Sequence, residues 1–114
     1  MTNKHEQAMR KCNDVKREYW MSDIMFQQYD ITVDCFLAVI ETGYISVYAF
    51  DKDMKNKVCV MSLINTPKNL AIAQLLAIEE TAKLPCRSEA GRENAESDLH
   101  TLIDQILEDG AISI

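Results

Sequence analysis

Residues 66–84 are the stretch in which apolar side chains fall on every side of a helix. At about 100° per residue, its leucines and isoleucines are spread around the whole circumference with alanines between them, and its polar residues cluster near the two ends. Thr66 followed by Pro67 is typical of a helix start, and Pro85 of a helix end. The apolar run is far shorter than the roughly 20 residues that cross a bilayer. The pattern therefore predicts a buried helix around which the fold is organised.

Helices with a single apolar stripe are predicted on both sides of this stretch. Residues 3–20 carry apolar side chains at spacings of three and four, with charged residues between them. The last helix is expected after a connection at residues 86–94, and Gly110 is placed to end it. Ser22 would suit the start of a short second helix, but one continuous helix fits equally well. The pattern therefore leaves open whether residues 3–29 form one helix or two.

Three strands are predicted between these helices, because residues 31–64 are rich in β-branched and aromatic side chains. The strands are expected at residues 31–41, 44–50 and 57–64, with a tight turn at 41–43 and a longer one at 51–56. The chain thus predicts the α+β class, a three-stranded antiparallel meander with an N-terminal helix and two C-terminal helices (α-β-β-β-α-α). We expect a single domain over residues 1–114.

Both faces of the predicted sheet carry apolar side chains. In the second strand, Ile45, Val47 and Ala49 alternate with Tyr44, Ser46, Tyr48 and Phe50. In the third, Cys59, Met61 and Leu63 are expected to oppose Val58, Val60, Ser62 and Ile64. A sheet with one solvated face alternates more cleanly. We therefore expect a helix of the same chain or a second copy to cover the second face, and the helix at residues 66–84 to be shared between the core and a second surface.

The net charge of −6 is concentrated in the last third of the chain. Residues 79–109 carry nine acids and three bases, and the charges of the preceding residues cancel. Four basic residues lie on the first predicted helix: Arg10, Lys11, Lys16 and Arg17. We interpret them as a solvated face, or as one that pairs with the acidic last helix, because an acidic protein lacks the phosphate attraction that supplies most nucleic-acid affinity. Direct nucleic-acid binding is not expected.

The cysteines indicate a reducing compartment. Cys12, Cys35, Cys59 and Cys86 are 23, 24 and 27 residues apart, which matches neither a CxxC metal site nor a dense disulfide framework. The start of the chain has no apolar run behind its lysine, so a secretory signal is not expected. We expect reduced thiols, a cytoplasmic location and no membrane partner.

Residues with catalytic chemistry are present but not grouped. His5 and His100 are the only histidines, and no spacing of zinc ligands accompanies them. Cys86 is the cysteine most exposed by the predicted elements, but a nucleophile there would need His100 as its base. The turn at residues 51–57 lacks the glycine and the distal glutamate of a calcium loop. The sequence therefore predicts no catalytic residue, no metal and no cofactor.

Two groups of residues are candidates for binding a partner. Trp20, Met25, Phe26 and Tyr29 form the most aromatic and methionine-rich patch, which suits an interface and equally a core. Glu96, Asp98 and Asp104 give the last helix an acidic surface for a basic or nucleic-acid-binding protein.

These features favour a non-enzymatic, small acidic protein-binding module of the inhibitor, chaperone or immunity type, acting as a homodimer through an apolar and acidic surface. In architecture alone the chain is similar to class I chaperones of type III secretion and to some phage-encoded anti-CRISPR inhibitors, although residues 85–94 leave little room for the two further strands of the chaperones. The alternative is a small-ligand-binding protein or minor enzyme. Its apolar pocket would lie between sheet and helices, with Tyr44, Tyr48 and Phe50 on one wall.

Overall fold

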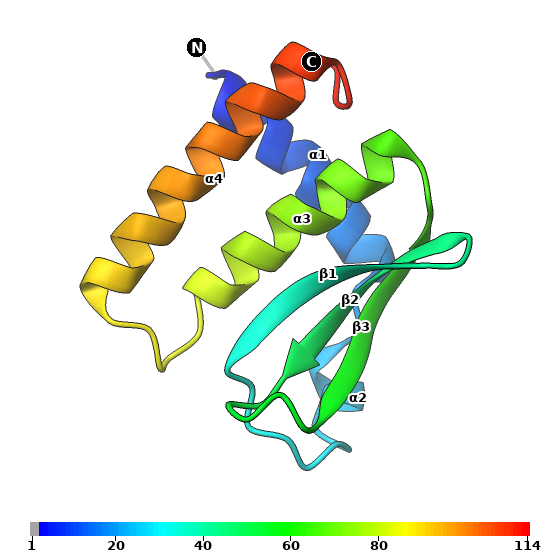
Figure 1. The fold of residues 1–114 in the computed structure, drawn as a ribbon, viewed down its shortest axis with the longest axis vertical. Coiled ribbons are helices and arrows are strands. Elements are labelled where there is room, and N and C mark those ends of the chain that lie inside the picture. The colour runs from blue at the N-terminus through cyan, green and yellow to red at the C-terminus, as the bar shows by residue number, and fades with distance from the viewer. Residues whose placement is uncertain (1–2) are drawn as a thin grey trace.

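The computed structural model describes residues 3–114, which form a three-stranded antiparallel sheet with helices packed on one of its faces (Figure 1). The elements are α1 (Lys4–Tyr19), α2 (Asp23–Phe26), β1 (Cys35–Glu41), β2 (Tyr44–Phe50), β3 (Lys57–Ile64), α3 (Pro67–Ala82) and α4 (Glu89–Asp109). This order confirms the predicted α+β class and the meander between an N-terminal helix and two C-terminal helices.

Each long helix begins at a side chain that accepts a hydrogen bond from the first turn. Asn3 accepts from the backbone of Glu6 in α1, and Thr66 caps α3 as its sequence predicts. Ser88 caps α4 by accepting from the amide of Gly91, so α4 starts at residue 89. The prediction that residues 86–94 are a connection was therefore wrong for their second half, because the Ser88 hydroxyl satisfies a helix start inside that segment.

Residues 3–29 form two helices, which settles what the pattern left open. After α1, Trp20 is extended, with a ψ of 137°. The next amide, that of Met21, donates to the carbonyl of Val60 at 2.7 Å, and Ser22 then caps α2. The first helix ends here because the backbone turns aside to pair with the free edge of β3.

The strands lie in the order β1-β2-β3, with Gly43 at a φ of 78° in the tight turn between the first two. The first strand was predicted from residue 31 but begins at Cys35. In β3, Met61 pairs with Val47 and Cys59 with Tyr48, which leaves one extra residue between them.

This bulge falls at Val60 and reverses the alternation along β3. Val58, Val60, Met61 and Leu63 are all buried, at 9% exposure or less. The predicted opposition of Met61 and Leu63 to Val58 was therefore wrong, because an extra residue shifts every later side chain to the other face.

The core lies between the sheet and helices α1, α3 and α4. In Figure 1, α3 runs beside β1, α4 runs antiparallel to α3, and α1 crosses behind α3. Six central residues of α3 are at most 5% exposed: Ala71, Ile72, Ala73, Leu75, Leu76 and Ala77. The chain itself thus buries the centre of α3, whereas Gln74 and Ile78 are only partly buried and line surface hollows. That this helix is shared with a second surface stays a prediction.

A candidate protein-binding face of the sheet

One face of the sheet points away from the helices, and we call it the outer face. The strand register places twelve residues on it: Cys35, Leu37, Val39 and Glu41 of β1, Tyr44, Ser46, Tyr48 and Phe50 of β2, and Lys57, Cys59, Ser62 and Ile64 of β3. On the opposite face of β2, Ile45, Val47 and Ala49 are fully buried. The helices therefore occupy that inner face, where α3 packs on β1 and β2 and α1 packs on β3.

Large apolar side chains of the outer face are open to solvent. Leu37 is 43% exposed, Tyr44 54% and Ile64 67%. Tyr48 and Phe50 are half-buried, and the centres of their rings lie 6.1 Å apart. The outer face is thus a largely apolar surface with an aromatic centre.

The polar groups of the outer face are paired within it. Ser46, only 2% exposed, lies 3.2 Å from the hydroxyl of Ser62 and donates to it. Tyr48 donates its phenolic proton to Glu41, and the ammonium of Lys57 lies 4.5 Å from the centre of the Tyr48 ring. A partner covering this face would therefore leave the serine pair and the Tyr48–Glu41 pair satisfied, and would need to supply an acceptor for Lys57.

The same contacts shift the ionisation of Tyr48. The hydrogen bond to Glu41, then burial, then the negative charge of that carboxylate raise the pKa of the Tyr48 phenol above its usual value. The phenol is therefore protonated at neutral pH and can donate its hydrogen bond.

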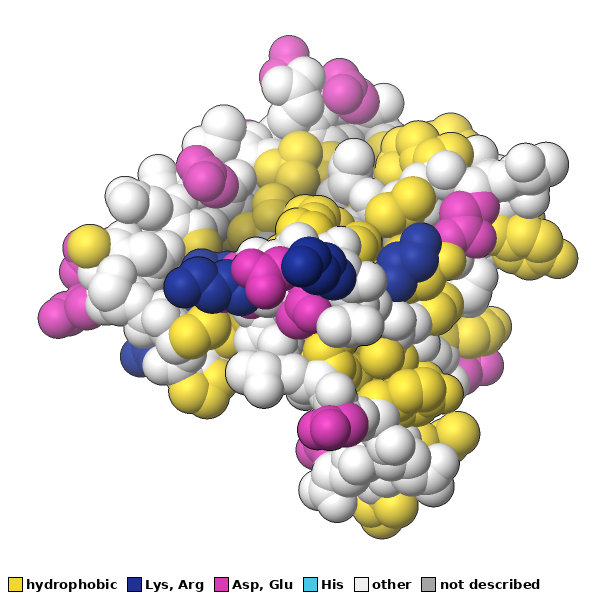
Figure 2. All heavy atoms as spheres, turned by 60° about the horizontal axis from the view of Figure 1, so that its bottom comes forward, with side chains coloured by type: hydrophobic (Ala, Val, Ile, Leu, Met, Phe, Trp, Pro, Cys, Tyr) yellow, Lys and Arg dark blue, Asp and Glu magenta, His cyan; other side chains and the backbone are white. Residues whose placement is uncertain are grey.

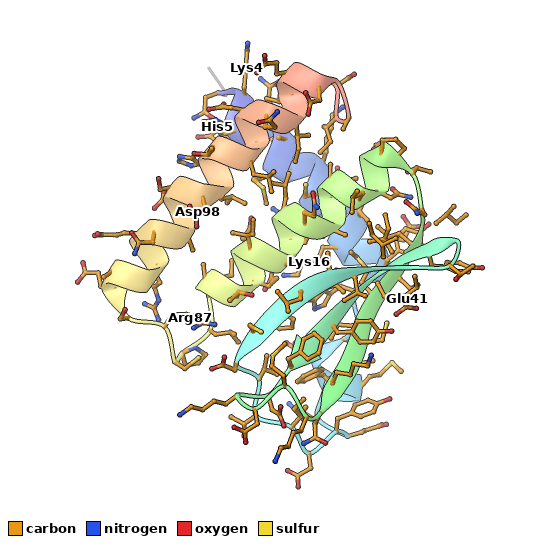
Figure 3. The ribbon with its side chains drawn as sticks, viewed as in Figure 1. Lys4, His5, Lys16, Glu41, Arg87 and Asp98 are labelled. Atoms are coloured by element: carbon orange, nitrogen blue, oxygen red, sulfur yellow. The ribbon has the colours of Figure 1, made fainter. Side chains whose placement is uncertain are left out.

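Glu41 and Lys57 occupy diagonal corners of the outer face. Glu41 ends β1 in the same row as Ile64, and Lys57 begins β3 in the same row as Cys35. Figure 3 shows Glu41 beside the sheet, far from Asp98 on α4. The face carries one acid and one base, so its net charge is zero.

The three residues predicted to line a ligand pocket do not lie between sheet and helices. Tyr44, Tyr48 and Phe50 do share one surface, as expected, but this surface is the outer face. A hollow of about 300 Å³ between β1 and helices α3 and α4 is lined by other residues, among them Leu37, Ile78 and Leu102. A second hollow, of about 480 Å³, lies along the end of α1 beside Lys16 and Trp20. The alternation of the strand brings the three rings together, but the sequence does not show which face the helices take.

The predicted patch at residues 20–29 is divided between core and surface. Trp20 packs on Phe36, with ring centres 5.4 Å apart, and Phe26 packs against the core. Met25 and Tyr29 are 54% and 49% exposed. Two neighbours in the sequence, Tyr19 and Ile24, are exposed as well, at 52% and 77%.

The three acidic residues predicted on the last helix do not form one surface. Glu96, Asp98 and Asp104 are all exposed on α4, but at 100° per residue Asp98 lies about 160° around the helix from Glu96. Asp104 faces α1, where its carboxylate is 2.6 Å from His5, and the His5 ring stacks on His100 with ring centres 4.5 Å apart. The acids therefore point to different sides of the molecule.

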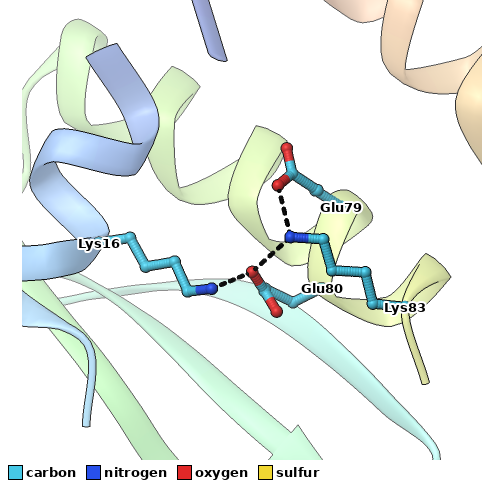
Figure 4. Close-up of polar contacts among 4 residues, drawn as sticks. All are labelled: Lys16, Glu79, Glu80 and Lys83. Atoms are coloured by element: carbon cyan, nitrogen blue, oxygen red, sulfur yellow. Dashed lines mark hydrogen bonds and ion pairs between the residues drawn. The ribbon is translucent and has the colours of Figure 1, made fainter. Parts of the chain in front are cut away.

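Of the four basic residues of α1, Arg10, Lys11 and Arg17 are exposed, and Lys16 is neutralised by α3 rather than by the last helix. Lys16 forms an ion pair with Glu80, whose side chain is 13% exposed (Figure 4). Lys83 joins the cluster at 2.9 Å from Glu79 and 3.5 Å from Glu80. Partial burial alone would lower the pKa of Lys83, but the hydrogen bond to Glu79 and the two negative charges outweigh it and raise that pKa.

Four outer-face residues were missed as site residues by the sequence: Leu37, Glu41, Lys57 and Ile64. Their signal is positional, since each falls in register with one of the predicted aromatic residues of β2. Elsewhere, Figure 2 shows broad hydrophobic patches on a side where basic and acidic side chains adjoin in the middle. Neighbouring opposite charges of this kind leave no large field of one sign there.

Within residues 3–114 no cluster of three or more His, Cys, Asp or Glu side chains is arranged to hold a metal ion. The four cysteines are free thiols, and no helix in this part of the chain has the length and apolarity needed to cross a membrane. Comparison with protein-family models, curated proteins and solved structures found no match. The outer face is therefore the basis for an inference about function.

Proposed function

We propose that this chain is a non-enzymatic protein-binding module of the inhibitor, chaperone or immunity type, which works in the cytoplasm as a homodimer. The observation that supports the proposal is the outer face, an apolar and aromatic sheet surface that the chain's own helices leave open. Four free thiols agree with a reducing compartment.

The shape of the outer face favours a protein over a small ligand. Small-ligand sites are concave and surround most of the ligand, whereas Leu37, Tyr44 and Ile64 stand on a sheet surface and are each more than two-fifths exposed. Contiguous apolar surface of this kind usually marks a protein interaction site. Its aromatic centre, Tyr48 beside Phe50, supplies the residue types that carry binding energy at interfaces.

A photo-crosslinking amino acid at Tyr44 tests this proposal in the native host. The matched control is Tyr19 on α1, which is 52% exposed against 54% for Tyr44. We expect a discrete protein adduct from position 44, absent from position 19 and lost when Ile64→Lys is added. Equal labelling from both positions, or no adduct from position 44, would contradict protein binding by the outer face.

A further inference from the structure

We infer that the outer face binds a second copy of this chain across a two-fold axis that lies in the interface. The inference rests on the proposed function, since it names the protein that covers this face. It requires a surface that is complementary to itself, because a two-fold interface uses the same patch on both subunits.

The two charges of the outer face meet this requirement. Glu41 and Lys57 lie on opposite sides of its centre, at diagonal corners. A two-fold axis that lies in the plane of the interface, perpendicular to the line between these two residues, exchanges their positions. Glu41 of one subunit then meets Lys57 of the other, and the symmetry produces two such pairs. The remaining corners, Cys35 and Ile64, are apolar or nearly so and bring no like charges together.

The balance of charge also favours a second copy over a strongly basic partner. The chain as a whole carries −6, but the outer face carries one acid and one base. A basic partner would find no net attraction on this face. Two copies that approach through it keep their acidic α4 helices out of the contact, since α4 packs on α3 and α1.

Burial of the outer face leaves its two internal polar pairs intact. Ser46 is paired with Ser62, and Tyr48 with Glu41, before any second copy arrives. The second carboxylate oxygen of Glu41 and the three donors of Lys57 remain available for the exchanged pair. Apolar contact and two charge pairs are therefore gained while Ser46, Ser62 and Tyr48 keep the hydrogen bonds that they already have.

The size of the face sets the strength of the dimer. Three strands about 4.8 Å apart and about seven residues long cover a footprint of about 15 Å by 23 Å. This is smaller than the roughly 800 Å² that each partner of a standard complex buries. We therefore expect a weak dimer, with a Kd in the micromolar range or above.

Sedimentation equilibrium from about 1 μM to about 1 mM tests the inference. We expect a reversible monomer–dimer equilibrium, weakened at least about tenfold by Leu37→Lys, because a charge on the apolar face is desolvated on contact. The matched control is Ile24→Lys on α2, since Ile24 is also an exposed apolar residue, at 77%. A wild-type chain that stays monomeric at the highest concentration, or equal weakening by both variants, would overturn the inference.

A charge exchange keeps the test independent of variants that fold poorly. We expect Glu41→Lys and Lys57→Glu to weaken the dimer separately, and the double variant to restore most of the affinity, because the exchanged pair is then rebuilt with reversed signs. Thermal melts check that each variant is folded. Additive losses in the double variant would exclude the pairing of these two residues across the axis.

Failure of this inference differs from failure of the proposed function. A monomeric chain that still gives an adduct with another protein from position 44 refutes the second copy and retains protein binding. A chain that gives neither a dimer nor an adduct refutes both.

Discussion

Cys12 shows how packing determines the chemistry of one residue. It is fully buried, and desolvation together with the negative charge of Glu79 raises the pKa of its thiol to about 12. We expect Cys12 to resist a thiol reagent such as DTNB at pH 8 while the exposed Cys59 and Cys86 react, and to react once the chain is unfolded. Mass spectrometry of the modified peptides measures this. Labelling of Cys12 as fast as Cys59 in the folded protein would contradict the packing of α1 on the core.

Tyr48 offers a pH-dependent readout of the outer face. Its hydrogen bond to Glu41 is the main cause of a raised pKa, so Glu41→Gln should lower that pKa towards the usual value of about 10. Because the folded pKa lies above the unfolded one, the stabilisation is complete below about pH 10 and is lost as pH rises through the folded pKa. Ring-carbon NMR shifts measure the titration, with Tyr44 as the internal control. An unchanged Tyr48 titration in the variant would refute the contact.

At the scale of elements, Thr81 joins α3 to the edge of β1. Its hydroxyl accepts from the amide of Phe36 at 2.8 Å and donates to the carbonyl of the same residue at 3.2 Å. Thr81→Val should lower the free energy of unfolding by about 1–3 kcal/mol, because it leaves two strand-edge groups without a partner. Urea unfolding measures the loss, and Thr81→Ser, which retains the hydroxyl, should cost less. Equal stability of wild type and Thr81→Val would mean that water replaces the contact.

The elements that the sequence predicts well are those set by local signals. The helix at Pro67–Ala82 follows from its cap, its proline and its apolar circumference, and the hairpin around Gly43 follows from a residue that tolerates a positive φ. The start of β1 does not follow, because residues 31–34 have strand-like side chains but lie outside the ladder. The backbone of Asp34 there accepts from Arg87, a residue far along the chain.

Only the part of the candidate site that depends on local signals could be predicted from the sequence. Alternation along β2 places Tyr44, Tyr48 and Phe50 on one side without any structural information. The side on which the helices pack depends on long-range choices, such as the bulge at Val60 and its hydrogen bond to Met21. No local pattern predicts these contacts. The sequence therefore predicts that both faces of the sheet are apolar, but not which face the helices leave exposed to solvent.

At the scale of the whole molecule, charge and apolar surface are kept apart. The excess of acids lies in residues 79–109, on α3, α4 and their connection, whereas the outer face belongs to the sheet. The molecule measures 41 × 36 × 23 Å. At about 10 mM salt the Debye length is about 30 Å, so the acids of one copy repel those of another across most of this distance. At about 150 mM salt it falls to about 8 Å, and only charges near the contact still act.

This separation predicts the direction of the salt dependence. Dimerisation through the outer face should strengthen when NaCl is raised from about 10 mM to about 150 mM, because the repulsion between two copies of charge −6 is screened. Sedimentation equilibrium at both salt concentrations measures it. A double variant, Glu93→Gln with Glu108→Gln, removes two exposed acids of α4 and should reduce the salt dependence without abolishing the dimer. A dimer that weakens with salt would contradict this prediction, because it would show that attraction between opposite charges at the contact outweighs the repulsion between the two copies.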